Sequence, residues 1–72
     1  MESMNYKDHT IKAQPEKLQD GKWQLKIKII EHRGHETITR LCSSSTSFHS
    51  QEEAIPHCFE FGRRVIDGDI VI

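Results

Sequence analysis

The chain of 72 residues has no long hydrophobic stretch. Its longest uninterrupted apolar run is Ile70–Ile72, far short of the roughly 20 apolar residues that a transmembrane helix needs. Glycine is also sparse, and the four glycines stand apart without forming the loop that cradles a phosphate before a helix. The sequence therefore predicts neither a membrane span nor a nucleotide-binding loop.

The N-terminal sequence lacks the apolar segment of a secretory signal peptide. Cysteine is scarce as well. Cys42 and Cys58 are the only two, whereas small disulfide-rich secreted scaffolds usually contain four or more. We therefore expect a cytoplasmic protein in which both thiols are free and act as small hydrophobic side chains.

Neither sign of charge is in clear excess. Ten Lys and Arg residues stand against 11 Asp and Glu residues, and the formal net charge is −1 at pH 7. This balance argues against a general binder of nucleic acids or anionic membranes, which would attract its partner through a strongly basic surface. With 35% hydrophobic residues, the chain has enough apolar side chains for one small core.

Alternating hydrophobicity predicts three strands. The clearest is Trp23–Ile29, where apolar and polar residues alternate with the period of two that turns one face of a strand toward a core. A weaker alternation predicts a first strand at Tyr6–Ala13, and a composition of Thr, Ile and Leu predicts a third at Glu36–Cys42. Glycine-containing turns at residues 20–21 and 33–35 separate them.

Breaks in the alternation predict irregularities in two of these strands. Ile30 interrupts the pattern of the second strand, which indicates a bulge or the margin of the sheet. Ile38 and Leu41 are out of phase with each other, which predicts a one-residue irregularity near Arg40. Residues 43–47 are all Ser or Thr, and we interpret them as a polar loop before the helix.

A single helix is predicted over residues 51–66. Ser50 is a candidate N-cap, and Glu53 three residues later completes the spacing of a capping box. Apolar residues then recur at helical spacing until Asp67-Gly68, where the glycine ends the helix. Pro56 removes a backbone hydrogen bond, so either the helix kinks there or a first turn leads into a second segment.

Together these elements predict an α+β fold in the order β-β-β-α, with a three-stranded antiparallel sheet packed on one face by the C-terminal helix in a two-layer sandwich. We expect residues 1–5 to be a flexible N-terminus, residues 6–68 the single domain and residues 69–72 a tail that is frayed, folded back or paired. Gly62 predicts a close approach of helix and sheet under Trp23. The expected core consists of Ile11, Trp23, Leu25, Ile27, Ile29, Ile38, Leu41, Phe48, Ile55, Cys58 and Val65.

Five histidines and two cysteines are the candidate metal ligands. Their spacing does not match a structural zinc site, because there is no C-x-x-C or H-x-x-x-H pair. Among these candidate ligands, the arrangement that remains is a metal site formed by Cys42, His49 and Cys58. The sequence shows no oxyanion loop, nucleophile elbow or paired carboxylates, so we expect neither enzymatic activity nor a cofactor.

Several segments resemble a group of small uncharacterised bacterial proteins. They are Gly21-Lys22-Trp23 before the alternating strand, FHSQEEAI at residues 48–55 and FGRRVIDG at residues 61–68, which follow the form F-x-S-x-E-E-A-I…F-G-R-x-x-I-D-G. The resemblance implies a three-stranded sheet packed by one long helix, similar in topology to the β-β-β-α part of double-stranded RNA-binding domains. Pro56 departs from the pattern, where a helix former is expected, and the group supplies no binding residues that could be transferred.

The electrostatics of the final helix contradict an RNA-binding role. RNA-binding members of that fold place lysines at the start of this helix, whereas Glu52 and Glu53 stand there in this chain and would repel phosphate. We therefore expect a protein partner, either another copy or an unidentified protein, that binds the uncovered sheet face, an open strand edge or the apolar tail.

Seven residues are the candidates for this interaction surface. Weak nucleic-acid binding by the four basic members and metal binding by the histidines and cysteines are the alternatives. We expect no membrane and no small-molecule substrate as partner. The seven candidates are Lys12, Lys26, Lys28, Arg40, Ile70, Val71 and Ile72.

Overall fold

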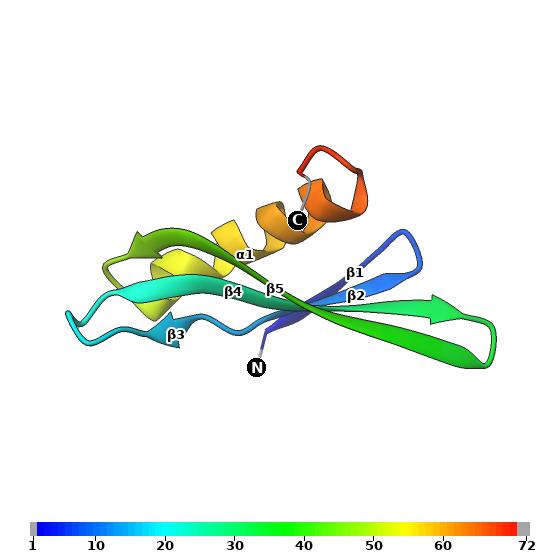
Figure 1. The fold of residues 1–72 in the computed structure, drawn as a ribbon, viewed down its shortest axis with the longest axis horizontal. Helices are drawn as coiled ribbons and strands as arrows, with labels where there is room; N and C mark the ends of the chain where they lie inside the picture. The colour runs from blue at the N-terminus through cyan, green and yellow to red at the C-terminus, as the bar shows by residue number, and fades with distance from the viewer. Residues whose placement is uncertain (1, 71–72) are drawn as a thin grey trace.

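The computed structural model describes residues 2–70. Five strands form one antiparallel sheet and a single helix lies on one of its faces, so the chain has an α+β fold (Figure 1). The predicted class is confirmed, but the three strands that we predicted are fewer than the five observed. The elements are β1 (Ser3–Tyr6), β2 (His9–Ala13), β3 (Glu16–Lys17), β4 (Trp23–Arg33), β5 (Glu36–Phe48) and α1 (Gln51–Ile66).

Strand β4 organises the sheet because it pairs along both of its edges. β2 and the short β3 lie along one edge, and β5 lies along the other. The predicted alternation places Leu25, Ile27 and Ile29 on the side of α1, where each is at most 5% exposed. Lys26 and Lys28 consequently point to the opposite face.

The helix approaches the sheet closely because small residues line its inner face. Ala54, Cys58 and Gly62 are all buried. A Cβ atom on Gly62 would lie 2.7 Å from Cγ2 of Ile11 in β2. The predicted close approach is confirmed, but the residue beneath the glycine is Ile11 and not Trp23, which is only partly buried.

Both ends of α1 follow the predicted signals. Ser50 Oγ accepts a hydrogen bond from the backbone N–H of Glu53 at 3.1 Å, and after the helix the backbone N–H of Asp67 donates to the carbonyl of Arg63. Pro56 neither ends nor divides the helix. It is exposed, so the carbonyl group that loses its usual intrahelical partner lies on the solvent side.

The first predicted strand is a hairpin of two strands. The backbone turns at Lys7 and Asp8, whose φ angles are 47° and 62°, and β1 pairs with β2. Such a turn is usually marked by Asn-Gly or Asp-Gly, so the sequence Lys-Asp gives little sign of it. Residues 3–5, which we expected in a flexible N-terminus, therefore belong to a strand.

Asp67 ties this hairpin to the end of the helix. The hydroxyl of Tyr6 donates to both carboxylate oxygens of Asp67, at 3.0 and 2.8 Å, and Nζ of Lys7 lies 2.6 Å from Oδ1. The hydrogen bonds from Lys7 and Tyr6 lower the pKa of Asp67, and the same contact with Asp67 raises the pKa of Lys7. The beginning and the end of the domain are thus joined by charge-assisted hydrogen bonds.

Strand β5 differs most from the prediction. Residues 43–47, predicted as a loop, continue the strand. The irregularity lies neither near Arg40 nor at Ile30, but where Leu25 alone faces Ser44–Thr46 of β5. The bulge therefore adds residues to the Ser-rich half of β5 and leaves the first half in regular register.

Two residues predicted for the core, Ile38 and Leu41, are instead exposed by 38% and 74%. Leu41 is the partner of Lys28 and shares its face, because the register is uninterrupted there. Ile38 points to the side of α1 but lies in the arm, which we define as residues 31–40 of the β4–β5 hairpin. The arm extends past the end of the helix (Figure 1), so no helical residue covers Ile38.

Candidate interaction surface

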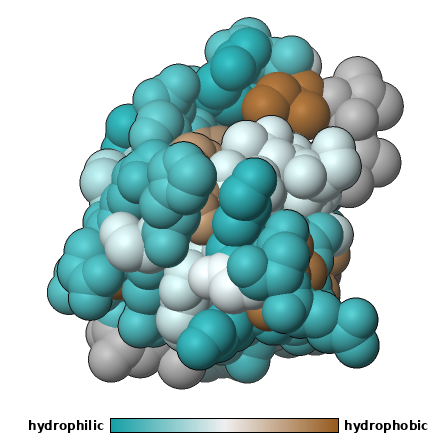
Figure 2. Space-filling model, turned by 90° about the vertical axis from the view of Figure 1, so that its left-hand side faces the viewer, coloured by the Kyte–Doolittle hydropathy of each residue, from teal (hydrophilic) through white to brown (hydrophobic). Residues whose placement is uncertain are grey.

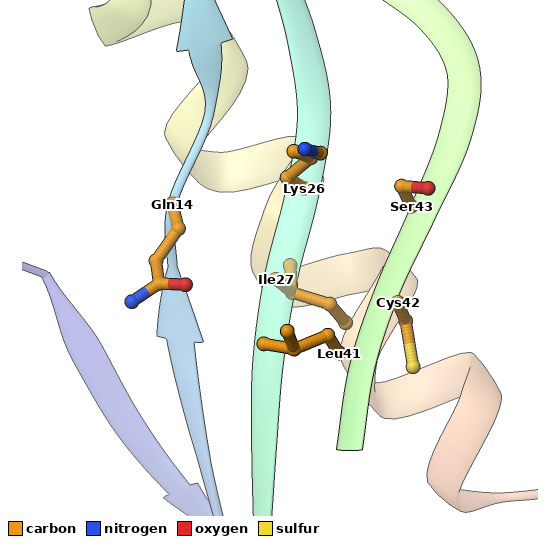
Figure 3. A pocket seen from close by; sticks show the side chains of 6 residues that line it. All are labelled: Gln14, Lys26, Ile27, Leu41, Cys42 and Ser43. Carbon is orange, nitrogen blue, oxygen red and sulfur yellow. The ribbon is translucent and has the colours of Figure 1, made fainter.

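The sheet face opposite α1 has no helix over it in the part of the chain that the structure describes. Figure 3 looks onto this face, with the helix behind the sheet. Lys26 and Lys28 belong to this face, because they alternate along β4 with Ile27 and Ile29, which point to α1. Lys12 of β2 belongs to the same face, because it is the Cα partner of Lys28. Three of the predicted interaction residues thus lie together on one surface, which we call the open face.

Lys12 and Lys28 are two like charges directly opposite each other. They are Cα partners in the pairing of β2 with β4, an arrangement that destabilises a sheet unless the charges are neutralised. Lys26 pairs with Glu16 at 3.2 Å, whereas no ion pair within residues 2–70 includes Lys12 or Lys28. The open face therefore contains two cations without a carboxylate partner among the described residues.

Arg40, the fourth predicted cation, lies on the other side of the sheet. It is the partner of Ile29, so its side chain points to the side of α1, in the exposed arm. The phase of this strand was ambiguous in the sequence, because Ile38 and Leu41 point to opposite faces. The basic cluster of the open face consequently has three members and not four.

A shallow hollow of about 290 Å³ lies in the open face. In Figure 3, Gln14 lies on the side of β2, whereas Leu41 and Ser43 are contributed by β5 and Lys26 by β4. Leu41 reaches over β4 and leaves an apolar side chain beside polar ones.

Strand β5 forms an edge of the sheet, and part of its backbone points outward. His32 of β4 donates its backbone N–H to Asp8, on the side of β2. Its partner Thr37 on β5 therefore turns its own N–H and C=O groups away from β4, and by alternation Thr39 and Leu41 do the same. No hydrogen bond within residues 2–70 uses these outward groups.

The bulge ends this unpaired row of groups. Gln24 Nε2 donates to the carbonyl of Ser44 at 3.1 Å, and the N–H of Thr46 donates to Ser44 Oγ at 3.2 Å. The regular unpaired stretch is therefore residues 37–43, which we call the open edge. The opposite edge of the sheet is formed by β1, with 4 residues, and β3, with 2, and such short edges offer little to a further strand.

The open edge is not evident from hydrophobic alternation. Its first half lies beyond the helix, so neither face of the strand is selected for apolar residues there. The signal that could have revealed it is the β-branched pair Thr37 and Thr39, since Thr favours strands even on exposed surfaces. The all-polar segment after Cys42 then continues the strand without an apolar face.

The predicted apolar tail is only partly described. Ile70 is partly buried against the core and, with Leu25 and Phe61, lines a hollow between α1 and β5. The backbone N–H of Asp69 donates to the carbonyl of Arg64, so the chain folds back after the helix. Val71 and Ile72 lie outside the described residues.

Both cysteines are free, as predicted, and both are buried. Cys58 is fully enclosed, and Cys42, although it stands next to the Ser-rich segment, is only 6% exposed. Burial raises the pKa of both thiols. The two side chains serve as members of the hydrophobic core, and neither is an activated thiolate.

The histidines are dispersed over the molecule. His32 Nε2 lies 2.8 Å from Thr10 Oγ1, and His57 stacks on Phe48 with 4.5 Å between ring centroids. Within residues 2–70, His, Cys, Asp and Glu side chains form no group of three that could hold a metal ion. The metal-binding alternative therefore finds no site in this range.

Exposed hydrophobic surface is concentrated on β5. Figure 2 shows the end of the molecule where the β3–β4 turn lies and α1 begins, and hydrophobic residues are visible there only as small separate patches. The exposed large hydrophobic residues among those described are Ile38 and Leu41, both on β5. In the described range, α1 is too short and too polar to cross a membrane.

Comparison with protein-family models, curated proteins and solved structures finds no match to this chain. The resemblance to small bacterial β-β-β-α proteins rests on the sequence motifs alone. The open face and the open edge are therefore the features from which a function must be argued.

Proposed function

We propose that this chain is a protein-interaction module whose open edge binds an extended segment of a protein partner as an additional strand. The observation that carries the proposal is the row of outward-pointing backbone groups at Thr37, Thr39 and Leu41, which have no partner within residues 2–70. A strand added at this edge would supply a hydrogen-bond partner for each of these N–H and C=O groups. Backbone pairing of this kind provides affinity for an extended chain.

Side chains beside the open edge provide selectivity. Leu41 points to the open face and Ile38 to the opposite one, so an added strand meets one exposed apolar side chain on each side of the sheet. Burial of these side chains contributes roughly 25 cal/mol for each Å² of apolar surface removed from water. Partners with apolar residues at the matching positions are therefore preferred.

A reducing compartment such as the cytoplasm is part of this proposal. Two buried thiols that are not joined in a disulfide support it, since disulfides persist mainly in oxidising compartments. A bacterial origin, which the sequence motifs suggest, is likewise part of the proposal, as is a role without catalysis.

A proline at position 39 tests the proposal. Thr39→Pro removes one outward-pointing N–H but no hydrogen bond to β4, and proline is tolerated at such edge positions. Thr39→Ala keeps the N–H and is the matched control. We expect a protein captured by the native chain and by Thr39→Ala to be lost with Thr39→Pro, and its binding to slow amide exchange at residues 37, 39 and 41. Equal capture by all three chains would contradict the proposal.

Weak nucleic-acid binding is a second candidate function, favoured by the opposed pair Lys12 and Lys28. A phosphate group between these side chains would relieve their repulsion. Titration with duplex RNA and single-stranded DNA at low salt tests this function, with the double variant Lys12→Gln/Lys28→Gln against the control Lys17→Gln/Lys22→Gln near the β3–β4 turn. Binding lost only in the first variant supports the function, and binding unchanged in it contradicts the function.

A further inference from the structure

We propose that the added strand is supplied by a second copy of this chain, and that two β5 strands pair antiparallel around a two-fold axis through Ile38. This inference rests on the proposed function, because it uses the same open edge. The feature that carries it is the spacing of Glu36, Ile38 and Arg40, which point to one side of β5. With this axis, Glu36 of each copy lies opposite Arg40 of the other.

The charges select this register over its neighbours. Outward-pointing groups of one strand must meet outward-pointing groups of the other, so the axis passes through a residue and not between two residues. An axis through Ile38 matches Glu36 with Arg40 twice. An axis through Thr37 or Thr39 leaves both charged residues opposite uncharged ones. The pairing at Ile38 is therefore the register in which the strand is complementary to itself.

Glu36 and Arg40 are available for such pairing. Both are exposed, and neither belongs to an ion pair within residues 2–70. Opposite charges across an antiparallel pair stabilise it, and like charges in the same positions destabilise it. Each copy thus contributes one Glu36 and one Arg40, and two Glu36–Arg40 pairs form across the dimer axis.

The apolar and β-branched residues fit the same register. Ile38, 38% exposed, meets Ile38 of the second copy on the axis. Its backbone groups point to β4, so this is a non-hydrogen-bonded position, where the Cα atoms of partners lie about 4.5 Å apart and their side chains touch. On the other face Thr37 lies opposite Thr39 of the second copy, a pairing that stabilises strands. Both faces of the shared sheet are therefore complementary.

The shape of the chain leaves room for this arrangement. The arm projects past the end of α1 (Figure 1), and residues 33–41 are all exposed. An axis at Ile38 pairs residues 36–40 with the same segment of the second copy, and this segment lies in the regular stretch between the hairpin turn and the bulge. The two helices then lie at opposite ends of the shared edge and do not meet.

Reversal of single charges tests the pairing and its register. Glu36→Arg places two guanidinium groups opposite each other on both sides of the dimer axis, and Arg40→Glu places two carboxylates there. Each variant alone is expected to dimerise about tenfold more weakly than the native chain in sedimentation equilibrium at low salt. An equimolar mixture of the two variants is expected to recover the native affinity, because each copy then contributes one sign of charge.

Two controls change the net charge equally but away from β5. Glu2→Arg and Lys22→Glu are expected to leave dimerisation unchanged, alone and mixed, and circular dichroism checks that every variant is folded. A native chain that stays monomeric at millimolar concentration would overturn the inference, whereas loss of another captured protein through Thr39→Pro would still support the proposed function. A dimer equally strong in both charge variants would overturn the register.

Discussion

Gly62 of α1 packs so closely on Ile11 of β2 that no side chain fits between them. A Cβ atom at position 62 would lie 2.7 Å from Cγ2 and 2.8 Å from Cδ1 of Ile11. Ile11 is fully buried, so it cannot move aside without displacing the rest of the core. The distance between helix and sheet is therefore set by the absence of a side chain at this position.

The variant Gly62→Ala measures this contact. In an unobstructed helix the change stabilises by about 1 kcal/mol, but overpacking of a core costs about 1–3 kcal/mol. We expect the second effect to prevail and the free energy of unfolding in urea to fall by about 1 kcal/mol. In an Ile11→Ala background, where the contacting atoms are absent, the same change should stabilise. A gain in stability for Gly62→Ala alone would contradict the close contact.

Asp67 gives the domain an acid-sensitive contact. Because Lys7 and Tyr6 lower its pKa from the ordinary value of 3.8, Asp67 stabilises the fold above that pH, and the contribution is lost as the pH falls through the lowered pKa. We expect Asp67→Asn to have a lower melting temperature than the native chain at pH 7. Below pH 3.8 we expect the two melting temperatures to approach each other. Asp69→Asn, two residues later, is the control, and an equal effect there would count against the contact.

The N-cap of α1 can be tested by shortening its side chain. Ser50→Ala removes the acceptor of the Glu53 N–H and is expected to lower the free energy of unfolding by about 1 kcal/mol. Ser50→Gly should cost only a few tenths of a kcal/mol, because glycine suits the cap backbone. Thermal and urea unfolding measure both changes. Equal stability of Ser50→Ala and the native chain would show that the hydrogen bond from the Glu53 N–H to Ser50 does not stabilise the fold.

The two native thiols should react slowly with a disulfide reagent at neutral pH. They are buried and their pKa values are raised, so labelling requires the domain to open. A thiol introduced by Leu41→Cys, at a position 74% exposed, should react rapidly in the same chain. Rapid labelling of Cys58 in the folded native chain would contradict its burial.

Sequence patterns predicted the elements that face the helix and failed where the helix does not reach. The alternation in β4 and the capping signals of α1 reflect burial and hydrogen bonding within a few residues, so they are visible locally. The arm lacks a buried face, and its residues therefore do not reveal their phase, as the exposure of Ile38 shows. The β1–β2 turn was missed because Lys7 and Asp8 adopt positive φ without the glycine that usually signals it.

The candidate site was predicted only in part, because local sequence patterns do not show how the strands align. Lys26 and Lys28 follow from the alternation of β4, whereas their relation to Lys12 depends on how two strands align, which no single strand encodes. Arg40 was grouped with them because its strand lacks a clear phase. The open edge depends on which strand ends the sheet, and that is a property of the whole topology.

The projecting arm places the proposed binding edge outside the cooperative core. Its side chains contribute little to the enclosed apolar cluster, so the tip can fray and re-form while the helix stays docked. Under the proposed function, changes at Glu36 or Arg40 therefore alter the pairing of strands with little effect on the global free energy of unfolding. If the arm is the binding element that we propose, substitutions in it change binding while the packed layer beneath it stays unaltered.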